Sequence, residues 1–150
     1  MLTDLLLAAL HHLLVFALIA MLVAESTLLR GPLDAAALQR LARIDAGYGM
    51  AAGFLLAAGL LRVFYGAKGS DFYLHNPWFH AKLGAYVLIG LLSLLPTLRF
   101  TRWRKALSAN PAFLPEPADV ARQRGVVRFE LILIAAILVP AAAMARYGGF

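Results

Sequence analysis

The sequence predicts an all-α integral membrane protein, a bundle of four membrane-spanning helices. Four apolar stretches, each about as long as a helix that crosses a bilayer, cover residues 5–24, 46–65, 81–98 and 126–145. Hydrophobic residues make up 62% of the chain and charged residues only 15%, too little charge for a water-soluble domain of 150 residues. Because the connections are short, we expect residues 1–150 to form a single transmembrane domain.

The segments that flank the stretches refine this prediction. No basic residue precedes the first stretch, and Arg30 follows it, so we expect a retained span rather than a cleavable signal peptide. The second and fourth spans are expected to continue into the cytoplasm as helices. Asp34 is a suitable N-cap for the second helix, and Pro117 suits the first turn of the fourth. The third span follows Asn76 and has Pro96 near its end.

The basic residues set the expected orientation. Ten of the fourteen lie in or beside the two loops that join spans one to two and three to four, and the others are Arg62, Lys68, Lys82 and Arg146. By the positive-inside rule, we expect a multi-pass protein of the bacterial inner membrane with both termini in the periplasm. Anionic lipid headgroups account for the net charge of +6, so no nucleic-acid partner is expected. The chain has no cysteine, which excludes disulfides and thiol catalysis.

Small residues in the second span predict close helix packing. Gly49 and Gly53 form a G-x-x-x-G pair, and Gly84 and Gly90 are candidates for the same purpose in the third span. In lipid, helices associate by close van der Waals approach, which small residues permit. We expect this packing within the bundle; a homo-oligomer that uses Gly49 and Gly53 is the alternative.

The four histidines are the main functional clue. His11 and His12 interrupt the first apolar stretch, and His75 and His80 precede or open the third, so all four are expected at one membrane edge. Two imidazoles from different helices are what axial ligation of haem requires. Here the predicted ligands are His80 and either His11 or His12. For His75, an exposed position outside any site is the simpler expectation.

Two cations accompany these histidines. Arg62 and Lys82 are expected at the same edge, where they suit the propionates of haem or an anionic substrate. Lys82 has the alternative of reaching the headgroups without a ligand. The histidines alone also suit a copper or zinc ion. A third alternative is a cofactor-free structural or assembly module in which the histidines form hydrogen bonds between helices.

A second polar set is expected at the opposite, cytoplasmic edge. It alternates acidic and basic residues: Glu25, Arg43, Asp45, Arg99, Arg128 and Glu130. Buried charges are normally paired, so salt bridges between helix ends are expected. The alternative is a proton path, since Glu25 and His11 fall within about 40° of each other on one helix face.

The chain resembles an uncharacterised family of small bacterial inner-membrane proteins over nearly its whole length. The residues that carry the resemblance are Leu-His-His at 10–12, Glu25, and Asn-Pro-Trp-Phe-His-Ala-Lys at 76–82. More distantly, it resembles the HemJ-type protoporphyrinogen oxidases, four-helix membrane proteins that bind haem b. Their early histidine matches His11 or His12, and their Trp-Leu-His-x-Lys stretch matches residues 78–82. This second resemblance implies a haem b site.

The function predicted from the sequence is therefore haem-based electron transfer, or oxidation of a hydrophobic or redox-active small molecule in the lipid bilayer. No G-x-S-x-G elbow, Walker A loop or H-E-x-x-H motif is present, which removes the usual support for hydrolase, nucleotide-driven and zinc-protease functions. The pattern assigns no catalytic residue, and whether the protein is an enzyme stays open at this point.

Overall fold

The computed structural model describes residues 2–65 and 69–147. Within these ranges it contains α1 (Leu2–Leu28), α2 (Ala35–Tyr65), α3 (Gly69–Leu74), α4 (Pro77–Ala109) and α5 (Pro117–Tyr147). Lys68, which was counted above among the basic residues, lies outside the described residues. The four long helices contain the four predicted spans, so the all-α, four-span fold class is confirmed.

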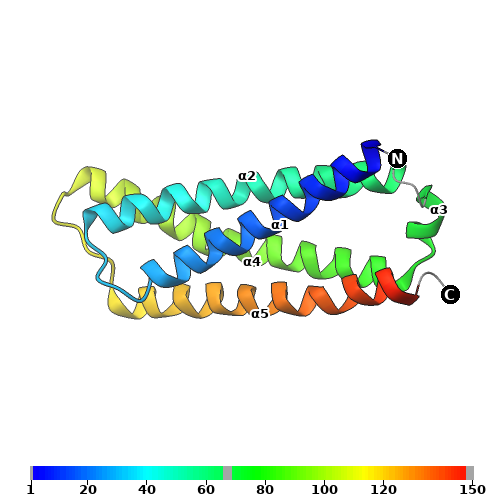
Figure 1. The fold of residues 1–150 in the computed structure, drawn as a ribbon. Helices are drawn as coiled ribbons and strands as arrows, with labels where there is room; N and C mark the ends of the chain where they lie inside the picture. The colour runs from blue at the N-terminus through cyan, green and yellow to red at the C-terminus, as the bar shows by residue number, and fades with distance from the viewer. Residues whose placement is uncertain (1, 66–68, 148–150) are drawn as a thin grey trace.

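The long helices form an antiparallel bundle (Figure 1). α1 packs against α2 and α5, and α4 packs against the same two helices, so they form a ring in the order α1, α2, α4, α5. The start of α1, the end of α5 and the short α3 lie at one end of the bundle, here called the terminal end (Figure 1). The loops 29–34 and 110–116 lie at the other, here called the loop end.

Local capping explains where three helices begin. The Asp34 carboxylate accepts a hydrogen bond from the Ala37 backbone N–H at 2.7 Å, one helical turn ahead. The Asn76 side chain caps α4 in the same way, accepting from the Trp78 N–H at 3.0 Å. α5 begins at Pro117, whose missing N–H costs nothing in a first turn. The predicted helical extensions of spans two and four beyond their apolar stretches are thus confirmed.

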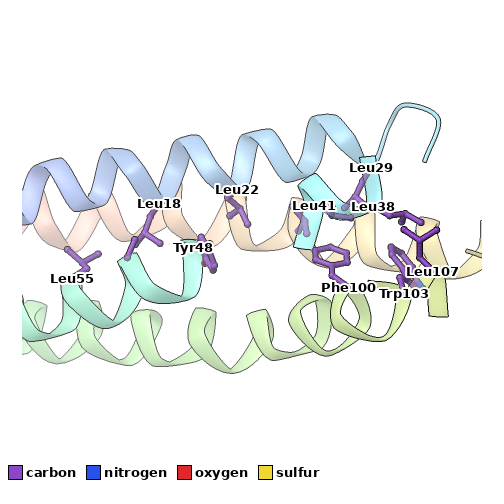
Figure 2. Packing of buried hydrophobic residues seen from close by; sticks show 12 residues of the cluster. Leu18, Leu22, Leu29, Leu38, Leu41, Tyr48, Leu55, Phe100, Trp103 and Leu107 are labelled. Carbon is purple, nitrogen blue, oxygen red and sulfur yellow. The ribbon is translucent and has the colours of Figure 1, made fainter. Parts of the chain in front are cut away.

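The apolar core lies mainly in the loop-end half of the bundle (Figure 2). Its buried members come from all four long helices: Leu18, Leu22, Leu29, Leu38, Leu41, Tyr48, Ala51, Leu55, Phe100, Trp103, Leu107 and Val127. No described residue of α1 before Leu18 is buried. In α5, none is buried between Leu131 and Met144. The buried side chains of the terminal-end half therefore come from α2, α3, α4 and the residue before α4, such as Val63, Tyr73, Ile89 and Asn76.

The outer surface of the bundle is apolar. Large hydrophobic side chains such as Leu5, Phe16, Phe54 and Val139 are exposed along the helices. All four long helices are long and apolar enough to cross a membrane. An apolar surface this extensive is matched by hydrocarbon rather than by water. The protein is therefore an integral membrane protein whose helices contact the lipid bilayer.

Candidate functional site

Three carboxyl groups lie inside the loop-end half of the bundle. Glu25 of α1, Asp45 of α2 and Glu130 of α5 are only 1%, 5% and 0% exposed, and we call them the acid cluster. Each follows or precedes a buried apolar residue by one turn, as Glu25 follows Leu22, so it lies on the inward face of its helix. Glu25 lies within electrostatic range of both Asp45 and Glu130.

The acid cluster has few hydrogen bonds. The Thr97 hydroxyl of α4 donates to an Asp45 carboxylate oxygen at 2.8 Å, so all four long helices contribute to this region. One oxygen of Glu25 and both oxygens of Glu130 are buried without a hydrogen-bond partner. Unpartnered carboxyl oxygens inside a membrane bundle are costly, and such groups are functional by default.

The predicted salt bridges at this edge are wrong for the acid cluster. In residues 2–65 and 69–147, no arginine or lysine forms an ion pair with any of its three members. Arg43 and Arg128 are exposed. Each lies two residues before an acid of the cluster, Asp45 or Glu130, on its own helix. Residues two apart lie about 200° apart around a helix, so the guanidinium and the carboxyl group point to opposite sides.

Arg99 forms a different ion pair. Its Nε lies 3.3 Å from an Asp119 carboxylate oxygen, and the Trp103 indole N–H donates to the same oxygen at 3.3 Å. This contact joins α4 to the first turn of α5 at the loop end. Arg99 therefore stabilises a helix junction rather than the acid cluster.

Three basic side chains gather in the terminal-end half. His11 of α1, Arg62 of α2 and Lys82 of α4 form what we call the cationic cluster, since Lys82 and Arg62 lie within electrostatic range of His11. The imidazole lies against α2 beside Gly59, whose added Cβ would lie 3.7 Å from His11 Cε1. Nδ1 of His11 and Nε of Arg62 are buried without a partner. Neither Arg62 nor Lys82 forms an ion pair with a described carboxylate.

The other histidines lie on the surface of the bundle. Nδ1 of His12 lies 2.6 Å from the Ala8 carbonyl oxygen, one turn back on its own helix. Nε2 of His80 lies 2.8 Å from the Leu74 carbonyl oxygen at the end of α3. His75 contacts the Asp71 backbone and carboxylate, at 3.0 and 3.2 Å. Of the four histidines, only His11 extends among the helices toward Arg62 and Lys82.

No metal cluster is evident among the described histidines and acids. No group of three or more His, Cys, Asp or Glu side chains within residues 2–65 and 69–147 could hold a metal ion. A site built from His11 therefore has cations, rather than further metal ligands, as its neighbours.

Sequence reasoning assigned no site role to three residues near these clusters. Trp78, already part of the family resemblance, lies one turn before Lys82 on α4, and its indole Nε1 is buried without a partner. Gly59 gives the His11 ring its place against α2. Gln123 of α5 is 3% exposed, and its Oε1 is also unpartnered. A polar residue two turns before a buried acid, as Gln123 is before Glu130, was the available signal.

The glycine pair in α2 does not pack inside the bundle. Gly49 and Gly53 are exposed, and an added Cβ at either would meet no atom within 4 Å. The same open space surrounds Gly84 and Gly90. The prediction of internal packing is therefore wrong for these four. The glycines in close contact with other helices are Gly59 and Gly47. A Cβ added at Gly47 would lie 3.2 Å from Met21 Sδ.

Comparison with known proteins agrees with this architecture. No curated protein and no solved structure matches the chain significantly. A family described as "Predicted membrane protein (DUF2214)" matches residues 3–149, which is almost the whole chain. The uncharacterised membrane-protein family expected from the sequence is thus confirmed, and the chain belongs to the DUF2214 family of membrane proteins.

Proposed function

We propose that the terminal-end half of the bundle binds haem b, and that the protein acts in electron transfer or in oxidation of a hydrophobic substrate within the membrane. One observation carries this proposal. His11, Arg62 and Lys82 come from three different helices and meet without a described acidic partner. An unpaired cationic set inside a membrane calls for an anionic ligand.

The residues of the cationic cluster fit the chemical groups of haem b. An imidazole can hold haem iron, and cations suit the two propionates on an otherwise apolar ring. His11 has a free ring nitrogen, Arg62 has a free Nε, and Lys82 completes the positive set. Sparse burial in this half also leaves apolar side chains of α1 and α5 accessible to a flat apolar ligand. When bound, haem would supply a one-electron carrier.

The second predicted ligand is less favourable. Nε2 of His80 and Nδ1 of His12 each lie within hydrogen-bond distance of a backbone carbonyl oxygen. Of the four histidines, His11 would therefore be the one to hold the haem iron. Haem held in this way would supply oxidation chemistry for a small molecule in the membrane as well as electron transfer.

The absorbance spectrum of the purified protein tests the proposal. We expect a Soret band after expression with a haem precursor, and its loss in His11→Ala. His12→Ala is the matched control, because His12 is the next residue on the same helix and is exposed. It should keep the band. A wild-type protein without a Soret band, or equal loss in both variants, contradicts haem binding at this site.

The same samples separate the alternatives. Copper without porphyrin in an elemental analysis would indicate the metal-binding alternative, which lacks a third described ligand here. Absence of any cofactor, with histidine variants that lose only stability, would indicate the structural or assembly module. Arg62→Met and Lys82→Met should weaken haem retention without removing it, because each takes away one cationic partner of the propionates.

We also propose where the protein lies and how it associates. The ten basic residues in or beside the two loops of the loop end favour a cytoplasmic loop end and periplasmic termini in a bacterial inner membrane. The exposed Gly49 and Gly53 favour contact with a second copy, because small residues permit close approach between helices in lipid.

A further inference from the structure

The acid cluster is not used by the proposed haem site. Glu25, Asp45 and Glu130 lie in the opposite half of the bundle, on three different helices, and all three are nearly or fully buried. Both carboxyl oxygens of Glu130 are unpartnered, and Glu130 lies within electrostatic range of Glu25. Glu130 therefore faces the other two acids across the bundle.

The surroundings of the acid cluster restrict what can bind there. No described arginine or lysine pairs with it, and no metal ion fits among the described acids and histidines. The packed neighbours are apolar, including Leu22 and Val127, both at 0% exposure. Three ionised carboxylates in such a place would repel one another without compensation. The charge-compensating ligand small enough for this space is the proton.

Two other polar groups lie beside the acid cluster: Thr97 of α4 donates to Asp45, and Tyr48 of α2 lies within electrostatic range of all three acids. Tyr86 of α4 lies within electrostatic range of Tyr48. The Tyr86 hydroxyl donates to the Ala52 carbonyl oxygen. No described basic side chain is among these groups, so the acids must balance their charge with protons.

A cavity at the loop end lies between α4 and α5, and Leu98, Arg99, Arg102, Arg122 and Gln123 are among the residues that line it. Gln123 is buried with an unpartnered Oε1. It lies seven residues before Glu130, which is two helical turns, or about 10 Å, along one face of α5. Gln123 thus lines the cavity and lies on the same face of α5 as Glu130.

We propose that Glu25, Asp45 and Glu130 form a proton-binding site that exchanges protons with water at the loop end through the cavity lined by Gln123. The site holds protons at neutral pH, and the three acids share fewer than three negative charges. Binding needs no co-reactant, since only a proton is taken up or released. The site is independent of haem, and its test does not depend on a bound cofactor.

Infrared spectroscopy of the purified chain in lipid vesicles tests the proton-binding site. A protonated carboxyl group gives a C=O stretching band that is separate from the bands of carboxylates and shifts in D₂O. We expect this band in the wild type at neutral pH, with a loss of intensity in Glu25→Gln and in Glu130→Gln. Glu116→Gln is the matched control, because Glu116 is exposed in the loop between α4 and α5, and it should leave the band unchanged.

Two results would overturn the proposal. One is a wild-type spectrum without a protonated carboxyl band at neutral pH, which would mean that all three acids are ionised. The other is an equal band in the wild type, Glu25→Gln and Glu130→Gln. The wild-type measurement alone decides the first point, so the test holds even where a variant fails to fold.

A second measurement tests the route. After transfer to D₂O, the protonated carboxyl band should shift as deuterons replace the bound protons, and the rate of this shift is measured. Gln123→Leu should slow the shift severalfold, because it replaces the polar group that lines the cavity on the same face of α5 as Glu130. Gln39→Leu is the control, since Gln39 is exposed on α2, and it should not change the rate. Equal rates in the two variants would overturn the route through Gln123.

Discussion

The acid cluster and the cationic cluster differ in what surrounds them. Around Glu25, Asp45 and Glu130, side chains from all four long helices are packed to low exposure. Around His11, the first part of α1 and the last part of α5 contain no buried residue among those described. In both clusters the ionisable side chains lack a described ion-pair partner of opposite sign, but only the cationic cluster has accessible surroundings.

This difference separates the roles that the two clusters can take. A tightly packed region admits protons but not a larger ligand, whereas a sparsely packed region can contact a flat molecule without disruption of a core. Stability should come mainly from the loop-end half, and ligand binding mainly from the terminal-end half. Functional regions are often drawn from the less stable part of a protein, which fits this division.

The largest expected effect is on stability and concerns Phe100. Its side chain is 1% exposed in the loop-end core (Figure 2), whereas Phe64 on α2 near the terminal end is 66% exposed. We expect Phe100→Ala to lower the free energy of unfolding by roughly the lower end of the 3–5 kcal/mol found for buried aromatics. The value should be low because lipid solvates an aromatic ring nearly as well as the core does.

Reversible unfolding in mixed detergent micelles measures this effect. Phe64→Ala is the control and should change the free energy of unfolding by less than about 0.5 kcal/mol, as surface substitutions usually do. Similar losses in the two variants would show that the two halves contribute equally to stability. The comparison on which the division of roles depends would then fail.

A smaller effect is expected at the junction of α5 with the end of α1. Arg124 donates two hydrogen bonds to the Leu29 carbonyl oxygen, from Nη2 at 2.6 Å and from Nε at 3.1 Å. We expect Arg124→Ala to cost about 1–2 kcal/mol, near the low end for hydrogen bonds to charged groups because water can replace the donor.

The same unfolding measurement applies, with Arg128→Ala as the control. Arg128 is exposed one turn further along α5 and forms no hydrogen bond with a described residue. If the free energy of unfolding falls equally in both variants, loss of positive charge rather than loss of the contact with Leu29 is responsible. A loss confined to Arg124→Ala locates a further part of the stability at the loop end.

The fold was predictable because each helix is marked by residues close together in the sequence. Hydropathy over about 20 residues finds each span, and single residues such as Asp34 and Pro117 mark helix starts. The end of α4 was missed, because basic residues follow position 98 and lower the hydropathy. The helix continues to Ala109 since Phe100, Trp103 and Leu107 lie on one face and pack into the core.

The site was less predictable because it depends on which face each helix presents. The spacing of two between Arg128 and Glu130 excludes an ion pair within α5, but pairs between helices depend on which face each helix turns toward its neighbours. The sequence could not choose between His11 and His12, which are adjacent and have the same apolar flanks. That choice depends on how α1 lies against Gly59 of α2, a contact between distant parts of the chain.

The smallest expected effect on folding concerns the outward glycines. An added side chain at Gly49 or Gly53 has open space, so the double variant Gly49→Leu/Gly53→Leu should fold as well as the wild type. Replacing glycine in a helix interior even favours the helix, by up to about 1 kcal/mol per site. If a second copy packs on this face, the same variant should lose self-association in detergent or vesicles.

Gly59→Leu is the inward counterpart of that variant. An added Cβ at this position would lie in van der Waals contact with His11 Cε1, at 3.7 Å, so the further carbons of a leucine would compete with the imidazole for its place against α2. We expect Gly59→Leu to reduce haem retention while self-association stays at the wild-type level. In contrast, a Gly49→Leu/Gly53→Leu protein that still self-associates would exclude the face of α2 with Gly49 and Gly53 as the contact between copies. Haem retention unchanged in Gly59→Leu would mean that the imidazole does not need its position beside α2, and the cationic cluster would then lose its role in positioning the ligand.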